Sequence, residues 1–287
     1  MEQNLRLIYQ ERASDPSTLG VLLVNKRDED DPDTDMFDAI LLIITSDEST
    51  PIYTKHYATE DGIAAMHVIS NRQLKKWLIV GSKRKVIDWL FNGVVYFDRN
   101  EYVENLKKQL RANPYLGQDI KMGLELSSLV RAYMEGKKFY EQRNYLDAYH
   151  HVVNSLHHLA RLAVIEKGLF PEVKVWNQVK KIDPAISKLY KELVTSEESL
   201  EKRLELLFLA SEFFIYNRTE KGATHILSIM SEKELWEIQE LHEQEELQLY
   251  SVNLEVYVEY LVKRGFIKVV EKKSKNPLIL HRLYKVQ

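Results

Sequence analysis

Two short apolar segments near the N-terminus constrain the fold most strongly. The first is Leu19–Val24 and the second is Phe37–Thr45. Continuous apolar runs of this length, bounded by polar residues, are typical of buried β-strands. Seven carboxylates lie between the two runs or at the start of the second: Asp28, Glu29, Asp30, Asp31, Asp33, Asp35 and Asp38. The sequence therefore predicts a sheet with an acidic rim, although most charge runs are simply solvated loops.

Carboxylates at the rim of a sheet can hold a hard cation. Mg²⁺ prefers oxygen ligands and keeps substrate phosphates as partners. We expect Asp35 and Asp38 to be the metal-binding and catalytic residues. Ser17, Thr18 and Gly20, at the start of the first run, are expected to hold a phosphate through hydroxyl and backbone N–H groups.

This layout resembles the nucleotidyltransferase superfamily, whose signature is a Gly-Ser turn followed by Asp-x-Asp at the start of the next strand. The segments His67–Leu74 and Asn92–Arg99 are similar to the later portion of such domains. The resemblance covers about the first 115 residues. It implies Mg²⁺ as cofactor and a nucleoside triphosphate as ligand.

The sequence departs from the family pattern at three points. Asp35 and Asp38 are separated by two residues, so in a regular strand their side chains would leave opposite faces. Gly20 is not followed by serine, and the strand expected to supply a third carboxylate, Ala64–Ser70, offers only His67. These departures predict a degenerate site with weak or no transfer activity in a protein that binds nucleotide or nucleic acid. An active Mg²⁺-dependent nucleotidyltransferase on an unknown acceptor is the alternative.

Helical periodicity dominates from about residue 119 to 223. Apolar residues recur at steps of three and four, and Gly168 with Pro171 marks a helix stop. A helical bundle after such a sheet resembles the substrate-binding domains of antibiotic nucleotidyltransferases. Arg143-Asn144 followed by His150 is also similar to a motif of HEPN-type ribonucleases, which gives a second alternative function.

The histidines and tyrosines of this helical region lead to two further predictions. Four histidines fall into two pairs, each pair two helical turns apart, with no acidic partner evident: His150, His151, His157 and His158. We expect them to be partly exposed residues rather than metal ligands. Four tyrosines predict either a homodimer contact or the lining of an interdomain cleft: Tyr133, Tyr140, Tyr145 and Tyr149.

The last segment, residues 224–287, has the pattern of a winged helix-turn-helix. Ser231 with Glu234 predicts a capping box, and Gly265 ends a later helix. Phe266–Glu271 and Leu278–Lys285 then predict a hairpin. Its basic side chains are expected to contact a phosphate backbone, as a wing does: Lys272, Lys273, Lys275 and Arg282. Three roles stay open for this segment: sequence-specific DNA binding, nonspecific contact with RNA, and a docking or structural role.

The composition of the chain excludes several kinds of site and of protein. The chain has no cysteine, which excludes disulfides, zinc–thiolate sites and thiol nucleophiles. It has no apolar run near the ~20 residues of a membrane span, and its start lacks the features of a secretory signal. We therefore expect a cytoplasmic, bacterial-type protein without membrane contact. The predicted class is α+β, with a nucleotidyltransferase-like mixed sheet domain (1–118), a helical bundle (119–223) and a small winged helix-turn-helix (224–287).

Overall fold

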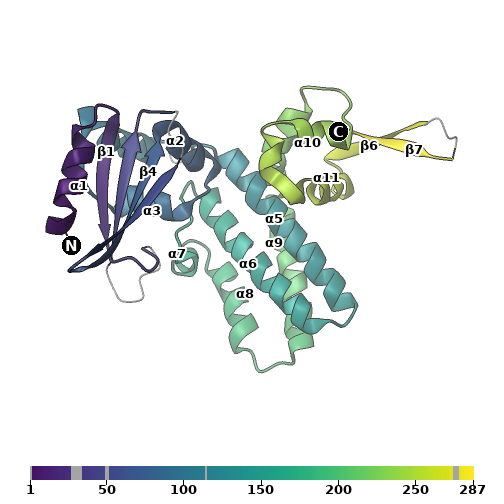
Figure 1. The fold of residues 1–287 in the computed structure, drawn as a ribbon. Coiled ribbons are helices and arrows are strands. Elements are labelled where there is room, and N and C mark those ends of the chain that lie inside the picture. The colour runs from purple at the N-terminus through teal and green to yellow at the C-terminus, as the bar shows by residue number, and fades with distance from the viewer. Residues whose placement is uncertain (1, 27–33, 49–51, 114, 274–277) are drawn as a thin grey trace. The chain divides into compact units, whose positions relative to one another are not determined.

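The structure is a computed structural model, and it describes residues 2–26, 34–48, 52–113, 115–273 and 278–287 of the 287-residue chain. The chain forms two compact units (Figure 1). The first comprises residues 1–117 and 168–174, and the second comprises residues 118–167 and 175–287. The predicted α+β class, with a mixed sheet, a helical region and a C-terminal helix-turn-helix, is confirmed.

A five-stranded sheet with the order β3-β4-β2-β1-β5 forms the centre of the first unit. Only β2 and β4 pair in parallel, and the other neighbours pair antiparallel. The strands are β1 (Thr18–Asn25), β2 (Ala39–Thr45), β3 (Tyr53–Thr59), β4 (Gly62–Ser70) and β5 (Val94–Asp98). The edge strand β3 was not predicted from the sequence, because most of its side chains are exposed and it lacks an apolar run.

Both faces of the central strands β1 and β2 are buried, which explains the continuous apolar runs. Odd-numbered residues of β2, such as Leu41, pack with Leu5 of α1 (Glu2–Ser14). Even-numbered residues, such as Leu42, pack against the helices of the opposite face. Those helices are α2 (Asn71–Val80), α3 (Arg84–Asn92) and α4 (Tyr102–Ala112), and the short η1 (Arg99–Glu101) precedes α4.

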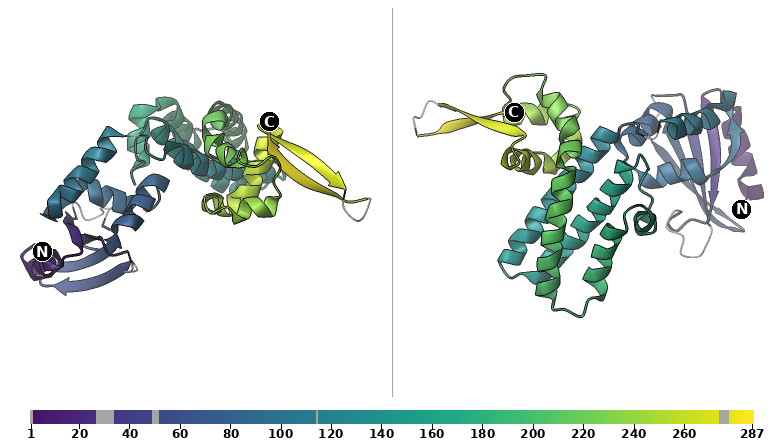
Figure 2. Two further views of the ribbon diagram at one scale, coloured as in Figure 1. Left: turned by 90° about the horizontal axis from the view of Figure 1, so that it is seen from above. Right: turned by 180° about the vertical axis from the view of Figure 1, so that it is seen from behind.

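Five helices form the bundle of the second unit (Figure 2). They are α5 (Gln118–Glu141), α6 (Tyr145–Glu166), α7 (Val175–Ile182), α8 (Pro184–Thr195) and α9 (Leu200–Met230). Glycine allows α5 and α9 to approach closely, because a Cβ added at Gly222 would lie 2.3 Å from Leu126 Cδ2. The 31-residue helix α9 continues through position 223, where the sequence analysis placed a domain boundary.

The C-terminal helix-turn-helix packs on this bundle within one hydrophobic core. Its elements are α10 (Ile238–Glu243), η2 (Leu247–Asn253), α11 (Leu254–Lys263), β6 (Ile267–Lys273) and β7 (Leu280–Val286). The buried Tyr250 side chain reaches α9, where its hydroxyl lies 3.0 Å from His225 Nδ1. Asn253 Nδ2 donates to Ser128 Oγ of α5 at 3.0 Å. The bundle and the helix-turn-helix therefore form a continuous unit.

The predicted capping box at Ser231 and Glu234 is wrong. Ser231 has helical backbone angles and terminates α9, with its N–H donating to Leu227 O at 2.9 Å. The capping box lies six residues later, at Glu237 and Glu240, and it starts α10. The prediction failed because α9 continues beyond the expected boundary, which places Ser231 at a helix end. None of the helices in the described ranges is long and apolar enough to cross a membrane.

Candidate functional site

Asp38 lies immediately before β2 and connects three strands. Its carboxylate Oδ2 accepts a hydrogen bond from Ile63 N–H at 2.9 Å, and its own N–H donates to Ile63 O at 2.9 Å. Lys26 N–H donates to Asp38 O at 2.9 Å. The side chain of Asp38 therefore has a structural partner at the start of β4.

Asp35 lies in a turn before β2 and pairs with a cation from α3. Its φ is +54°, and Phe37 N–H closes the turn by donating to Thr34 O at 3.1 Å. The carboxylate forms an ion pair with the Lys85 ammonium group. A bend of the kind needed to bring Asp35 towards Asp38 does occur, but Lys85 already supplies Asp35 with a positive charge.

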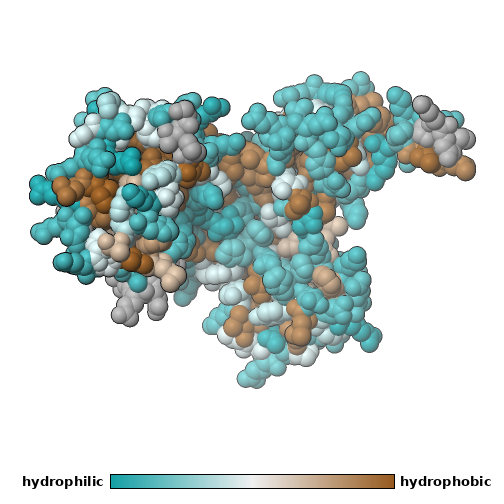
Figure 3. Space-filling view, in the orientation of Figure 1, coloured by the Kyte–Doolittle hydropathy of each residue, from teal (hydrophilic) through white to brown (hydrophobic). Residues whose placement is uncertain are grey.

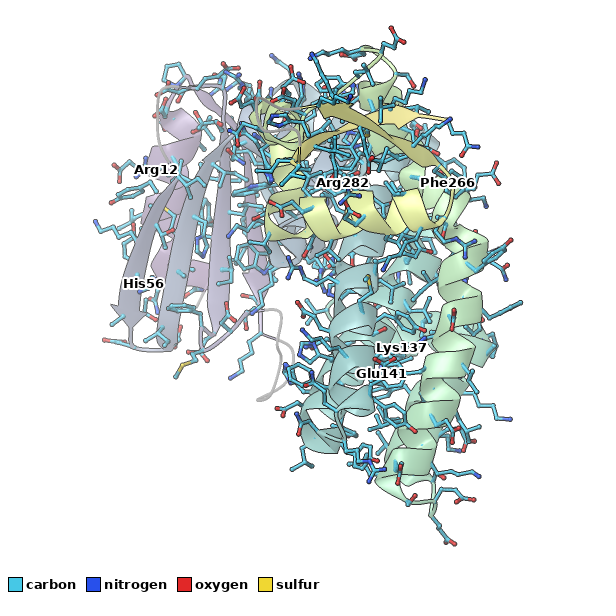
Figure 4. The ribbon with its side chains drawn as sticks, turned by 90° about the vertical axis from the view of Figure 1, so that its right-hand side faces the viewer. Arg12, His56, Lys137, Glu141, Phe266 and Arg282 are labelled. Atoms are coloured by element: carbon cyan, nitrogen blue, oxygen red, sulfur yellow. The ribbon has the colours of Figure 1, made fainter. Side chains whose placement is uncertain are left out.

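Aromatic and imidazole groups surround this rim on the α3 face of the sheet. His67 stacks on Trp89 with ring centroids 5.0 Å apart, and its Nδ1 lies 3.0 Å from Thr54 Oγ1. His56, labelled in Figure 4, lies 4.7 Å from the Phe37 ring. In the sequence, His67 stands out only as the residue found where the family pattern has an acid. His56 and Lys85 were not predicted, and they lie on an edge strand and a helix distant in sequence.

The pKa of His67 reports on this cluster. Burial lowers the pKa of His67, the neighbouring His56 lowers it further, and the Asp35 carboxylate raises it. In an NMR titration, His67 should therefore titrate below the ordinary value of about 6.5. Asp35→Asn should move the pKa lower still, because it removes the attraction and leaves the Lys85 charge unpaired. Glu104→Gln on α4 is the control and should leave it unchanged. A His67 pKa at or above 6.5, or one insensitive to Asp35→Asn, would contradict this arrangement.

The predicted phosphate-binding residues lie at the opposite end of the sheet from Asp38. Gly20 pairs with Ile44, whereas Ala39, next to Asp38, pairs with Asn25. Five residue steps therefore separate them, which is roughly 17 Å along the strands. This separation does not favour one small ligand that reaches both groups, and the assigned roles of these residues stay a prediction.

The three residues at that end have structural roles. Ser17 Oγ donates to Asp15 Oδ1 at 2.7 Å, and Thr18 O accepts from Arg99 Nε at 2.7 Å. A Cβ added at Gly20 would lie 2.3 Å from Val103 Cγ2, so glycine allows α4 to pack on β1. The small residues that suggested a phosphate cradle reflect turn formation and close packing.

The residues at the rim do not fit a Mg²⁺ ion held jointly by Asp35 and Asp38. One carboxylate is paired with an ammonium group and the other is bound to a backbone N–H. Within the described ranges, no group of three or more His, Asp or Glu side chains has a metal-binding arrangement. The acidic residues Asp28, Glu29, Asp30, Asp31 and Asp33 lie outside the described residues.

Two of the bundle histidines do have acidic partners, contrary to the sequence analysis. His158 Nδ1 lies 2.9 Å from Glu125 Oε2, and His151 Nδ1 lies 3.4 Å from Glu135 Oε2. Both glutamates come from α5, a separate helix, so spacing within α6 could not reveal them. Glu125 is buried and also pairs with Arg161.

The residues of the ribonuclease-like motif are near the start of α6. Arg143 lies in the preceding turn with φ +62°, and His150 Nε2 lies 3.1 Å from Asn154 Nδ2. These contacts do not favour a nuclease site, and the ribonuclease alternative stays a prediction.

The C-terminal hairpin has two different faces. Directly paired residues of an antiparallel ladder share a face. Ile267 and Tyr284 are buried on the inner face, where Arg282 makes two bonds to the Glu259 carboxylate of α11, at 3.0 and 3.1 Å (Figure 4). Arg282 is therefore already paired, and Lys273 shares its face.

Three lysines and His281 lie on the outer face of the hairpin, beside the half-buried Val270 and Leu283. Lys268 pairs with Lys285 in the ladder, and Lys272 pairs with His281. These three lysines form no ion pair with the residues that the structure describes, and we call them the outer-face lysines. Of the predicted nucleic-acid residues, Lys272 alone is among them, and Lys275 lies outside the described residues. Period-two alternation in the two strands could have identified Lys268 and Lys285.

Apolar side chains lie at the start of β7 and just before it. Leu278, Ile279 and Leu280 are exposed there, as the brown surface at this end in Figure 3 shows. The hairpin thus combines a lysine-bearing outer face with three exposed apolar residues.

A mixed five-stranded sheet with a rim site, followed by a helical bundle and a helix-turn-helix, defines a nucleotidyltransferase-like protein. Comparisons with known families agree. A model described as Nucleotidyltransferase-like matches residues 1–118, one described as YgxA-like substrate binding domain matches 119–218, and one described as Helix-turn-helix domain matches 224–286.

Two similar proteins span the whole chain. The uncharacterized protein YgxA of Bacillus subtilis (strain 168) is 45% identical over 284 residues, which are 99% of this chain and 97% of that protein. A crystal structure of a nucleotidyltransferase-like protein from Exiguobacterium sibiricum 255-15 has 36% identity and a TM-score of 0.80, covering 100% of this chain and 99% of that one. The chain belongs to the YgxA family of nucleotidyltransferase-like proteins, which confirms the resemblance found in the sequence.

Proposed function

We propose that this protein binds nucleic acid through its C-terminal hairpin and that its sheet does not catalyse ordinary Mg²⁺-dependent nucleotidyl transfer. The observation that carries the proposal is the set of outer-face lysines, Lys268, Lys272 and Lys285, on a helix-turn-helix domain. Lysines that are not engaged by protein carboxylates can neutralise phosphates and release their counterions, which favours binding.

Helix α11, at the recognition-helix position, argues against the reading of base edges. The side chains that α11 leaves exposed or half-buried include Glu255 and Glu259, and Glu259 is engaged by Arg282. Carboxylates at this position repel phosphates and offer few of the donors that read base edges. We therefore expect weak dependence on nucleotide sequence.

The sheet supports the second half of the proposal. Transfer requires a cation and phosphates held together where charge develops. Lys85 competes with a cation for Asp35, the Asp38 carboxylate is bound to Ile63 N–H, and Gly20 lies at the other end of β1. Nucleotide binding at the rim, without transfer, stays a prediction.

A transfer assay tests the catalytic half. The protein is incubated with each labelled nucleoside triphosphate, with Mg²⁺ or Mn²⁺, and with total RNA, small-molecule or protein acceptors. We expect no incorporation above that of an Asp38→Ala variant, while RNA is retained with the protein in the same reaction. Robust incorporation that Asp38→Ala abolishes would contradict the proposal and support the active enzyme.

A further inference from the structure

Helix α9 carries an exposed apolar face. Four large side chains on it are more than half exposed: Leu206 (53%), Leu209 (64%), Phe213 (63%) and Tyr216 (59%). Single exposed apolar residues are ordinary, but several along one helix indicate a contact surface. The opposite side of α9 is already used, because residues such as Leu204 and Ile215 are buried in the bundle core.

The spacing of these residues is that of a helix-pairing seam. Steps of three, four and three residues connect Leu206 to Tyr216, and a further step of four leads back to Lys202 and onward to Glu220. This alternation is the heptad pattern of the a and d positions in paired helices. Lys202 and Glu220 are exposed and form no ion pair with the described residues. We call these six residues the α9 seam.

The opposite charges at the two ends of the α9 seam favour a second copy of the chain as the partner and an antiparallel arrangement of the two helices. In an antiparallel pair of α9 helices related by a twofold axis at the level of Ser211, Leu206 faces Tyr216 of the other copy and Leu209 faces Phe213. The same axis places Lys202 opposite Glu220. A parallel pair would instead place Lys202 against Lys202 and Glu220 against Glu220, which is unfavourable.

We infer that the protein forms a homodimer in which the α9 seam of one copy packs antiparallel against the α9 seam of a second copy. Figure 2 shows α9 along one side of the bundle. The Arg264 guanidinium of the same chain lies 3.8 Å from the centre of the Tyr216 ring, and the Tyr216 side chain is still 59% exposed.

The tyrosines that suggested a dimer in the sequence lie elsewhere. Tyr133 Oη donates to Glu212 at 3.1 Å, Tyr145 Oη donates to Glu201 at 2.6 Å, and the Tyr140 ring contacts Phe208. With Tyr149, they pack against the core of their own bundle. We therefore still expect a homodimer, but one formed through the α9 seam and not through these tyrosines.

Light scattering tests the seam over a concentration series of roughly 1 to 100 µM, where interfaces of modest size associate. The wild-type protein is expected to show the mass of a dimer. Leu209→Asp combined with Phe213→Asp should raise the dissociation constant at least about 100-fold, because four charges would be buried in each dimer. Leu146→Asp with Val194→Asp is the matched control, since both residues are exposed and lie outside the seam. Circular dichroism melting confirms that each variant is folded.

A wild-type monomer throughout the series, or equal weakening of the dimer by the control substitutions, would overturn the inference.

Charge reversal and cross-linking test the direction. Lys202→Glu and Glu220→Lys should each weaken the dimer, and the two together should restore it. Because the chain has no cysteine, any disulfide that forms between two copies must involve the introduced thiols. Leu206→Cys with Tyr216→Cys should form disulfides between copies. Leu206→Cys alone should not, because ten residues of helix separate the two thiols by about 15 Å, too far for a disulfide. Cross-linking by Leu206→Cys alone, or no restoration by the double reversal, would overturn the antiparallel arrangement.

Discussion

Replacing Glu125 with leucine should lower the free energy of unfolding by about 3 to 5 kcal/mol, the cost of removing one partner from a buried charge cluster. Glu125 is 8% exposed and receives Arg161 and His158 from α6. One turn earlier on α5, Lys121 is 5% exposed, and burial lowers its pKa to about 8. Without the carboxylate, Arg161 and His158 would both lose this partner at a buried position.

Glu125→Gln is the matched control for this prediction. The amide oxygen can still accept a hydrogen bond, so we expect a smaller loss of stability than for leucine. Chemical denaturation followed by circular dichroism gives both values. Equal stability of Glu125→Leu and the wild-type protein would show that the cluster does not stabilise the bundle.

Much of the fold follows from local patterns. The apolar runs at Leu19–Val24 and Phe37–Thr45 correspond to β1 and β2, which are buried on both faces, and the hairpin corresponds to β6 and β7. Gly265, with φ +79°, follows α11 as expected. These features are local, because burial of both strand faces and a left-handed residue after a helix each leave a signal within a few residues.

The contacts around Asp35 and within the bundle were harder to predict than the strands and helices, because they join segments that are distant in the sequence. Lys85 lies 50 residues from Asp35, and Glu125 lies 33 residues from His158. Spacing within one element cannot show such pairs. Gly20 illustrates a different difficulty, because a glycine needed for close packing against Val103 looks the same in a sequence as one in a phosphate-binding turn.

Changing Lys268, Lys272 and Lys285 together to glutamine should weaken nucleic-acid binding by roughly two orders of magnitude at low salt. Each phosphate contact contributes about 0.9 to the slope of log affinity against log salt concentration for duplex DNA and about 0.7 for single strands. Losing three contacts should therefore reduce the slope by about 2 to 3. The matched control changes three exposed lysines on α7 and α8 to glutamine, giving the same net charge: Lys180, Lys181 and Lys188.

The salt dependence of binding, measured by fluorescence anisotropy with duplex DNA and single-stranded RNA, tests whether the hairpin binds nucleic acid. We expect steep salt dependence for the wild-type protein and for the control variant at Lys180, Lys181 and Lys188. The variant at Lys268, Lys272 and Lys285 should bind much more weakly and with a shallower slope. Absence of binding, salt-insensitive binding, or equal binding by both variants would contradict a nucleic-acid site on the outer face of the hairpin.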